Sequence, residues 1–136
     1  MQTWLITGAS RGLGRHLARG FAARGDHVLA CAREASRLDT LAAEPSAGRI
    51  TPVPLDLAEA TQIGPCLRSA IEAAGGLDGV VNNAGIGSWK SFEAHSEQEL
   101  LQILQVNLGA CMQICHLVLP WLRARGGGHI VNIGSD

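Results

Sequence analysis

A glycine-rich segment near the start of the chain has the spacing of an anion-binding turn. Residues 7–14 read TGASRGLG and lie between an apolar run and a helical pattern. Glycines at such a junction let the main chain approach a diphosphate closely, while free N–H groups and the helix dipole stabilise the negative charge. The segment therefore predicts dinucleotide binding, with a purely structural turn as the alternative. The contacts expected from this loop come from Gly8, Ser10, Arg11, Gly12, Leu13 and Gly14.

Other polar residues follow later apolar runs in the same way. Asp56 and Leu57 come after one run, the segment 82–85 (NNAG) after the next, and Ser135 after the last. In open α/β sheets, ligands bind at the carboxyl ends of the strands, so these segments are candidates for one site. Asp56 has a second interpretation as a helix N-cap, because Glu59 lies three residues further on.

The elements that must position these residues alternate between strand and helix along the whole chain. We expect strands at 4–7, 27–32, 50–55, 79–82 and 129–133, and helices from about 13 to 24 and at 35–43, 59–74 and 97–125. This alternation is typical of βαβ units and predicts an α/β fold with a doubly wound parallel sheet and helices on both faces. Pro52 and Pro54 place the third strand at an edge of the sheet, since proline cannot donate to a ladder.

Composition limits the classes of function. The 136 residues include 11 basic and 12 acidic side chains, a formal charge of −1, and 46% are apolar. A strongly basic binder of nucleic acid or of a membrane surface is therefore disfavoured, and so is a disordered chain. We expect a single domain over residues 1–136 that binds neither nucleic acid nor membrane.

The four cysteines show no CxxC spacing, and no secretion signal precedes the first strand. Free thiols in a reducing cytoplasm are expected. Cys111, Cys115 and His116 lie within about a turn and a half of one helix, yet no further ligands follow at metal-binding spacing, so packing is preferred over a metal site. The loop 87–92, which contains Trp89, is equally consistent with the border of a substrate site and with a plain surface loop.

Residues 100–122 contain no Asp, Glu, Lys or Arg and are long enough to cross a bilayer. Six residues interrupt the apolar character of this stretch: Gln102, Gln105, Asn107, Gln113, His116 and Pro120. Buried polar groups are costly in lipid, so we expect a helix buried in a soluble domain or at a subunit interface. Pairing of helix 97–125 with its copy in a homo-oligomer and packing inside the chain both remain open.

The loop spacing, Gly8-x3-Gly12-x-Gly14, resembles the TGxxxGxG loop of the short-chain dehydrogenase/reductase family. Further matches in the family's order are Asp56-Leu57, Asn82-Asn83-Ala84-Gly85, Val106-Asn107-Leu108 and the segment 130–135 (IVNIGS). The resemblance implies a Rossmann fold with strand order 3-2-1-4-5. It also implies that Asp56 bonds the adenine amino group, that Leu57 lies beside the ring, and that Asn83, Ala84 and Gly85 leave room for the adenine ribose.

The end of the second strand indicates which nicotinamide cofactor is preferred. An NAD-specific site usually has an acidic residue there, which accepts the ribose hydroxyls and repels a 2′-phosphate. Here Arg33 comes first, and Arg11 in the glycine loop should approach the same region. Two guanidinium groups favour NADPH over NADH. Alternatively, Arg33 is a solvated side chain paired with Glu34 or Asp39.

Enzymes of the family that the chain resembles transfer a hydride between nicotinamide and a carbonyl or alcohol substrate, using Asn, Ser, Tyr and Lys. Asn107 and Ser135 match the Asn and Ser positions. The chain contains no tyrosine, and its only lysine, Lys90, lies on a loop. We therefore expect an N-terminal cofactor-binding portion of a longer NADP(H)-dependent oxidoreductase, inactive by itself. The alternative is a non-catalytic dinucleotide-binding module or an inactive remnant.

Overall fold

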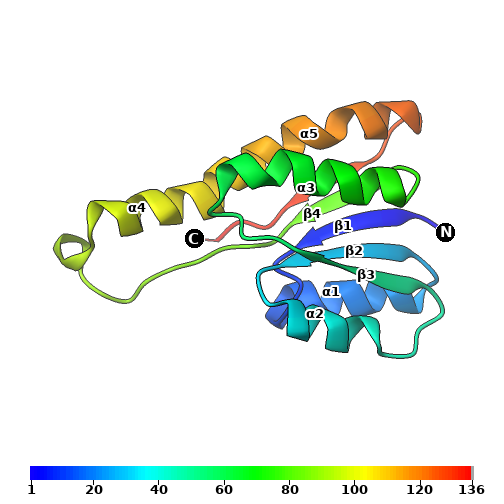
Figure 1. Ribbon diagram of the computed structural model, residues 1–136, viewed down its shortest axis with the longest axis horizontal. Helices are drawn as coiled ribbons and strands as arrows, with labels where there is room; N and C mark the ends of the chain where they lie inside the picture. Colours follow the sequence, from blue (N-terminus) through cyan, green and yellow to red (C-terminus); the bar gives the residue numbers. More distant parts are fainter. Residues whose placement is uncertain (136) are drawn as a thin grey trace.

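The computed structural model describes residues 1–135, in which strands and helices alternate along the chain (Figure 1). The elements are β1 (Thr3–Thr7), α1 (Gly12–Ala23), β2 (His27–Ala32), α2 (Ala35–Ala42), β3 (Arg49–Pro54), α3 (Ala60–Ala73), β4 (Gly79–Asn82), the short 3-10 helix η1 (Phe92–Ala94), α4 (Glu97–Leu104), the π-helical turn η2 (Gln105–Gly109), α5 (Ala110–Ala124) and β5 (His129–Asn132). All strand pairs are parallel, in the order β3-β2-β1-β4-β5. The predicted doubly wound sheet and its strand order are confirmed.

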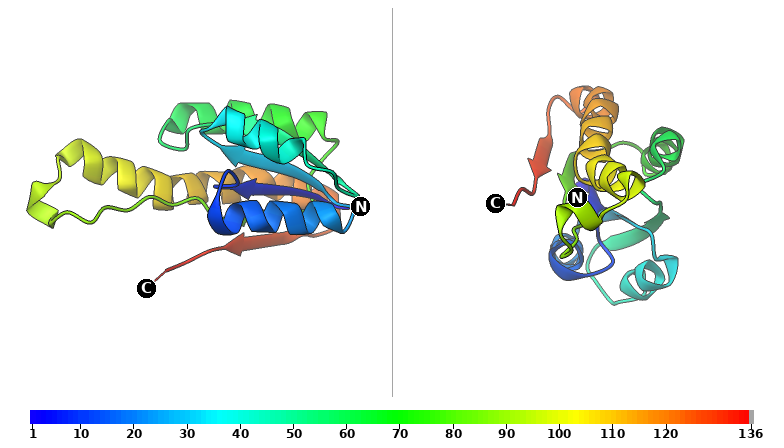
Figure 2. Two further views of the ribbon diagram at one scale, coloured as in Figure 1. Left: turned by 90° about the horizontal axis from the view of Figure 1, so that it is seen from below. Right: turned by 90° about the vertical axis from the view of Figure 1, so that its left-hand side faces the viewer.

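Helices cover both faces of the sheet, with α1 and α2 on one side and α3 and α5 on the other (Figure 2). Alternate residues of each central strand enter one of two cores, because successive side chains of a strand point to opposite faces. Ile6 packs with Ala18 of α1 and Leu38 of α2. Leu5 packs in the other core with Leu67 of α3 and Ile114 of α5. Every residue of β1, β2 and β4 is buried, as expected for strands covered on both faces.

The strand β3 lies at one edge of the sheet, as its two prolines predicted. The N–H of Arg49 donates to the carbonyl of Asp26 at 3.1 Å, and the N–H of Leu55 donates to that of Ala32 at 2.9 Å. Odd-numbered residues of β3 therefore face β2 with their N–H groups. Pro52 and Pro54 fall on the side that no strand occupies, where the missing donors break no hydrogen bond of the ladder.

The helical stretch after β4 differs from the prediction of one helix over 97–125 that is buried in the domain or at a subunit interface. The π-helical turn separates α4 from α5, and α4 has no buried residue. Whereas α5 packs along α3, α4 extends beyond the sheet together with the loop after β4 (Figure 1). Burial within the chain was therefore wrong for α4, because no other described element lies over it. The stretch Glu97–Ala124 is long and apolar enough to cross a membrane by length and composition.

Candidate functional site

The glycine loop joins β1 to α1 in the backbone conformation that its glycines permit. Gly8 and Gly12 have φ values of 65° and 56°, in the left-handed region that favours glycine. Gly14 is needed for a different reason: a Cβ atom there would overlap the carbonyl oxygen of Gly8. At Gly12, by contrast, a Cβ would meet no atom within 4 Å. The loop is thus held close to the first turn of α1 while its outer side stays open.

The hydroxyl of Thr7 fixes the glycine loop to the turn after β4. It accepts hydrogen bonds from the N–H groups of Asn83 and Ala84, both at 3.0 Å. The side-chain amide of Asn83 in turn donates to the carbonyls of Thr7 (3.1 Å) and Gly8 (3.4 Å). Thr7 is 1% exposed, so this link is shielded from water. The loop spacing includes Thr7 but predicts no role for it, because nothing in the spacing reveals its partners.

A cleft of about 260 Å³ opens at the carboxyl ends of β1, β2 and β4. Its lining consists of Gly8, Ser10, Arg11, Gly12, Cys31, Ala32, Arg33, Glu34, Leu55, Asp56, Leu57, Asn83, Ala84, Gly85, Ile86 and Val106. All predicted cofactor contacts are therefore brought together there except Leu13 and Gly14. Leu13 is 51% exposed outside the lining, and Gly14 supports the loop from behind. Ala32 and Leu55 also line the cleft but were not predicted to do so. Their positions at the ends of β2 and β3 could have indicated it.

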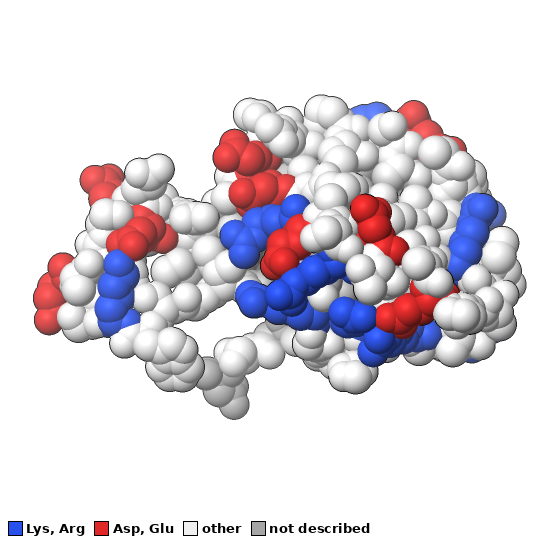
Figure 3. Space-filling view, turned by 60° about the horizontal axis from the view of Figure 1, so that its bottom comes forward, with Lys and Arg blue, Asp and Glu red and all other residues white. Residues whose placement is uncertain are grey.

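The charged groups on the cleft wall differ in their pairing. Arg11 and Arg33 are exposed and form no salt bridge within residues 1–135. The predicted alternative, in which Arg33 pairs with Glu34 or Asp39, is therefore not found. Glu34 pairs instead with Arg37, at 2.7 Å between Oε2 and Nε. Figure 3 shows basic and acidic side chains side by side on the face that α1 and α2 cover.

Asp56 lies on the cleft wall with one carboxylate oxygen already used. Oδ1 accepts a hydrogen bond from the N–H of Ala58 at 3.0 Å, which closes the turn before α3. The N-cap position of α3 is Glu59, so the alternative interpretation of Asp56 as an N-cap is wrong. Because Asp56 is only partly buried, its second oxygen is available to a ligand in the cleft.

Asn107 and Ser135 are less closely integrated into the site. Asn107 lies on the π-helical turn and is tied to Ile86: its Oδ1 accepts from the Ile86 N–H at 2.7 Å, and its Nδ2 donates to the Ile86 carbonyl at 2.8 Å. It also lines a smaller cavity of about 40 Å³ next to the cleft. Ser135 is exposed, three residues past the end of β5, and is not part of the cleft lining. Lys90 forms a salt bridge with Glu99 at 2.6 Å, on the projecting loop.

The cysteines are all free thiols. Burial raises the pKa of Cys31, on the floor of the cleft, to about 12. Burial, together with the neighbouring Cys115, also raises the pKa of Cys111, whose Sγ lies 3.5 Å from Oδ1 of Asn132. Residues 1–135 contain no group of three or more His, Cys, Asp or Glu side chains arranged to hold a metal ion.

Known proteins share this architecture. The ketoacyl reductase HetN of a Nostoc species is 36% identical over 98% of this chain and 47% of its own length. A metagenomic short-chain oxidoreductase in complex with NADP has a TM-score of 0.92 and 31% identity, covering 98% of this chain and 62% of that one. The L-sorbose reductase of Gluconobacter frateurii, complexed with NADPH and L-sorbose, has a TM-score of 0.88 and 31% identity, covering 96% of this chain and 51% of that one.

The chain spans about half the length of the curated relatives it matches. The family model described as short chain dehydrogenase matches residues 2–136. With its 3-2-1-4-5 sheet and its TGxxxGxG loop, the chain belongs to the short-chain dehydrogenase family.

Proposed function

We propose that the chain binds a nicotinamide dinucleotide in the cleft at the carboxyl ends of β1, β2 and β4. The observation that carries this proposal is the glycine loop, where two left-handed glycines open toward the cleft and Gly14 admits close packing behind them. The first turn of α1 has no acidic residue and no side-chain cap, so its N–H groups are available to a diphosphate. The residues present therefore fit the cofactor.

NADPH is the proposed cofactor, in preference to NADH. Arg11 and Arg33 lie on the cleft wall, exposed and free of carboxylate partners within the described residues. A guanidinium can donate two parallel N–H groups to a phosphate. It binds an uncharged ribose hydroxyl less strongly. Asp56 and Leu57, which also line the cleft, would hold the adenine, and Ala84 and Gly85 would border the adenine ribose.

The proposed role is that of the cofactor-binding part of an oxidoreductase that acts on small carbonyl or alcohol substrates. When bound, the nicotinamide supplies or accepts the hydride. Ser135 would hydrogen-bond the substrate oxygen, and Asn107 would hold the loop after β4 through Ile86. A positioned general acid or base contributes about 10²- to 10⁴-fold, and the sequence has no tyrosine for that role. The 136-residue chain is therefore proposed to bind cofactor without turnover.

Titration calorimetry tests the cofactor assignment. The purified chain should bind NADPH more tightly than NADH, and Arg33→Gln should weaken NADPH binding at least about tenfold, since a charged hydrogen bond is worth about 1.5–3 kcal/mol. NADH binding should change little. Arg68→Gln, at an exposed position of α3, is the matched control and should alter neither affinity. Equal affinities for the two dinucleotides, or tighter binding of NADH, would reject the preference.

A spectrophotometric assay tests the expected lack of turnover. NADPH absorbance should stay at the background rate when a panel of ketones and aldehydes is added to the purified chain. Carbonyl-dependent oxidation of NADPH would reject the inactive assignment and would favour an acid other than tyrosine. Binding of NADPH without turnover supports either the cofactor-binding part of an enzyme or a non-catalytic dinucleotide-binding module.

The helical stretch 97–125 is proposed to pair with its copy in a homo-oligomer rather than to enter a membrane or bind nucleic acid. Its exposed apolar side chains recur at helical spacing: Leu101, Leu104, Leu108 and Met112. Leu104→Glu should lower the mass measured by light scattering if this stripe is an interface. Because all four cysteines are free, a reducing compartment, the cytoplasm, is the proposed location.

A further inference from the structure

Glu34 is a carboxylate on the cleft wall that the proposed preference for NADPH does not explain. It stands two residues past the end of β2, next to Arg33, and both side chains line the cleft. A carboxylate in this region accepts hydrogen bonds from the ribose hydroxyls of NADH and repels a 2′-phosphate. A free Glu34 would therefore oppose the effect of Arg11 and Arg33.

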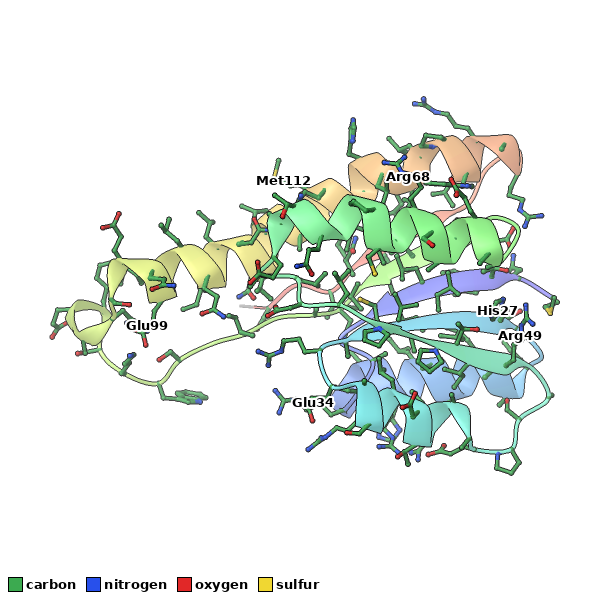
Figure 4. The ribbon with its side chains drawn as sticks, viewed as in Figure 1. His27, Glu34, Arg49, Arg68, Glu99 and Met112 are labelled. Atoms are coloured by element: carbon green, nitrogen blue, oxygen red, sulfur yellow. The ribbon has the colours of Figure 1, made fainter. Side chains whose placement is uncertain are left out.

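Arg37 compensates the charge of Glu34. Its Nε lies 2.7 Å from Oε2 of Glu34, one helical turn away, on the first turn of α2. Glu34 occupies the N-cap position of α2, yet its side chain accepts no capping hydrogen bond. The carboxylate is directed to Arg37 instead. Figure 4 shows Glu34 at the start of α2, at the end of the sheet where the cleft opens.

We propose that Arg37 is a positioning residue for cofactor selectivity: by holding the Glu34 carboxylate, it keeps that charge from the adenine ribose and leaves Arg11 and Arg33 to a 2′-phosphate. This inference rests on the proposed binding of a nicotinamide dinucleotide. Arg37 is not part of the cleft lining, so it acts through Glu34 and not by direct contact. Loss of Arg37 would free the carboxylate to turn toward the ribose.

The effect should be a few-fold, because both side chains are about half exposed. Exposed ion pairs contribute about 0.2–1 kcal/mol, which corresponds to a factor of up to about five in an affinity ratio. The sensitive quantity is the ratio of the dissociation constant for NADH to that for NADPH. A change that merely loosens α2 would weaken both dinucleotides together and leave this ratio unchanged.

The experiment is a double-mutant cycle read by titration calorimetry with NADPH and NADH. Arg37→Gln should lower the NADH-to-NADPH ratio about three- to fivefold, and Arg37→Lys, which keeps the charge, should stay within about twofold of the wild type. In the Glu34→Gln background, Arg37→Gln should have no further effect on the ratio. Arg68→Gln is the matched control and should leave the ratio unchanged, because Arg68 lies on α3, on the opposite face of the sheet (Figure 4).

The outcomes separate the two proposals. If the wild type binds NADPH and the ratio is the same in Arg37→Gln, the role of Arg37 is rejected while the cofactor assignment stands. A shift of the ratio that persists in the Glu34→Gln background also rejects it, since Arg37 would then act independently of that carboxylate. If the wild-type chain binds neither dinucleotide, the cofactor assignment and the role of Arg37 both fail.

Discussion

The cleft and the end of β5 both lie at the carboxyl ends of the parallel strands, but they differ in how firmly contacts hold them. Around the cleft, the shielded hydroxyl of Thr7 and the amide of Asn83 link β1 to β4 by hydrogen bonds between residues more than seventy positions apart. Along β5, by contrast, every residue is exposed, and so is Ser135. The part proposed to bind the cofactor is therefore fixed by contacts within the fold, whereas the part expected to act on a substrate is not.

The largest expected effect comes from breaking the packing behind the glycine loop. In Gly14→Ala, the new Cβ would overlap the Gly8 carbonyl, and either the loop or α1 must move. We expect a loss of about 3 kcal/mol or more in the free energy of unfolding, measured by urea denaturation, and at least tenfold weaker NADPH binding.

Gly20 supplies the control for that substitution. It lies on α1 as well, yet a Cβ there meets no atom within 4 Å. Gly20→Ala should stabilise the protein by about 0.5–1 kcal/mol, because alanine is the better helix former. If Gly14→Ala and Gly20→Ala behaved alike, close packing of the loop on α1 would not be what Gly14 provides.

A smaller loss is expected from Thr7→Val, which keeps the side-chain shape and removes only the hydroxyl. The N–H groups of Asn83 and Ala84 then lose their acceptor in a buried place, at a cost of about 1–3 kcal/mol. Ser135→Ala, at the exposed end of β5, should change the free energy of unfolding measured in urea by no more than about 0.5 kcal/mol. Equal effects of the two substitutions would contradict the difference between the two regions.

The smallest effects concern two carboxylates with strongly lowered pKa values. Hydrogen bonds from Arg19 and Arg15 lower the pKa of Glu44 to about 2 and link α1 to the residues after α2. Lys90 and the N–H of Ser96 lower the pKa of Glu99 to about 2, but these contacts stay within the projecting segment. Glu44→Gln should lower the urea midpoint of the whole domain. Glu99→Gln should leave it unchanged and only speed amide hydrogen exchange in α4.

The sign of the pH dependence follows from these pKa values. The pKa of Glu44 is lower in the folded chain than its ordinary value of 4.5. The carboxylate therefore stabilises the fold fully above that value and loses its contribution as the pH falls toward 2. The difference between wild type and Glu44→Gln should be constant above about pH 5, shrink below pH 4.5 and vanish as the pH falls through about 2. A difference that grows on acidification would contradict the ion pairs with Arg15 and Arg19.

Most of the fold was predictable because strand and helix periodicities alternate clearly. The strands 27–32 and 79–82 were predicted to the residue, and Pro52 and Pro54 correctly placed β3 at an edge. Glycine spacing and strand ends also identified most of the cleft, since parallel strands bring their carboxyl ends to one edge.

What the sequence did not reveal depends on tertiary contacts. Apolar residues of α4 have the pattern of a buried helix, and only the structure shows that Leu101 and Leu104 face no other element. The π-helical turn at Asn107 likewise leaves no mark in the periodicity, although its side chain bonds the main chain of Ile86. The role of Thr7 and the pairing of Glu34 with Arg37 could not be predicted, because the sequence does not show which groups lie within about 3 Å of each other.

The two prolines of β3 determine which edge of the sheet can accept another strand. With Pro52 and Pro54 on its outward side, that margin offers few N–H groups to an incoming strand, so recruitment of foreign chains there is disfavoured. At the opposite margin, β5 contains no proline and is exposed along its length. An additional strand, whether from this polypeptide or from another molecule, is therefore expected to pair with β5. The β3 edge is protected from aggregation by its prolines.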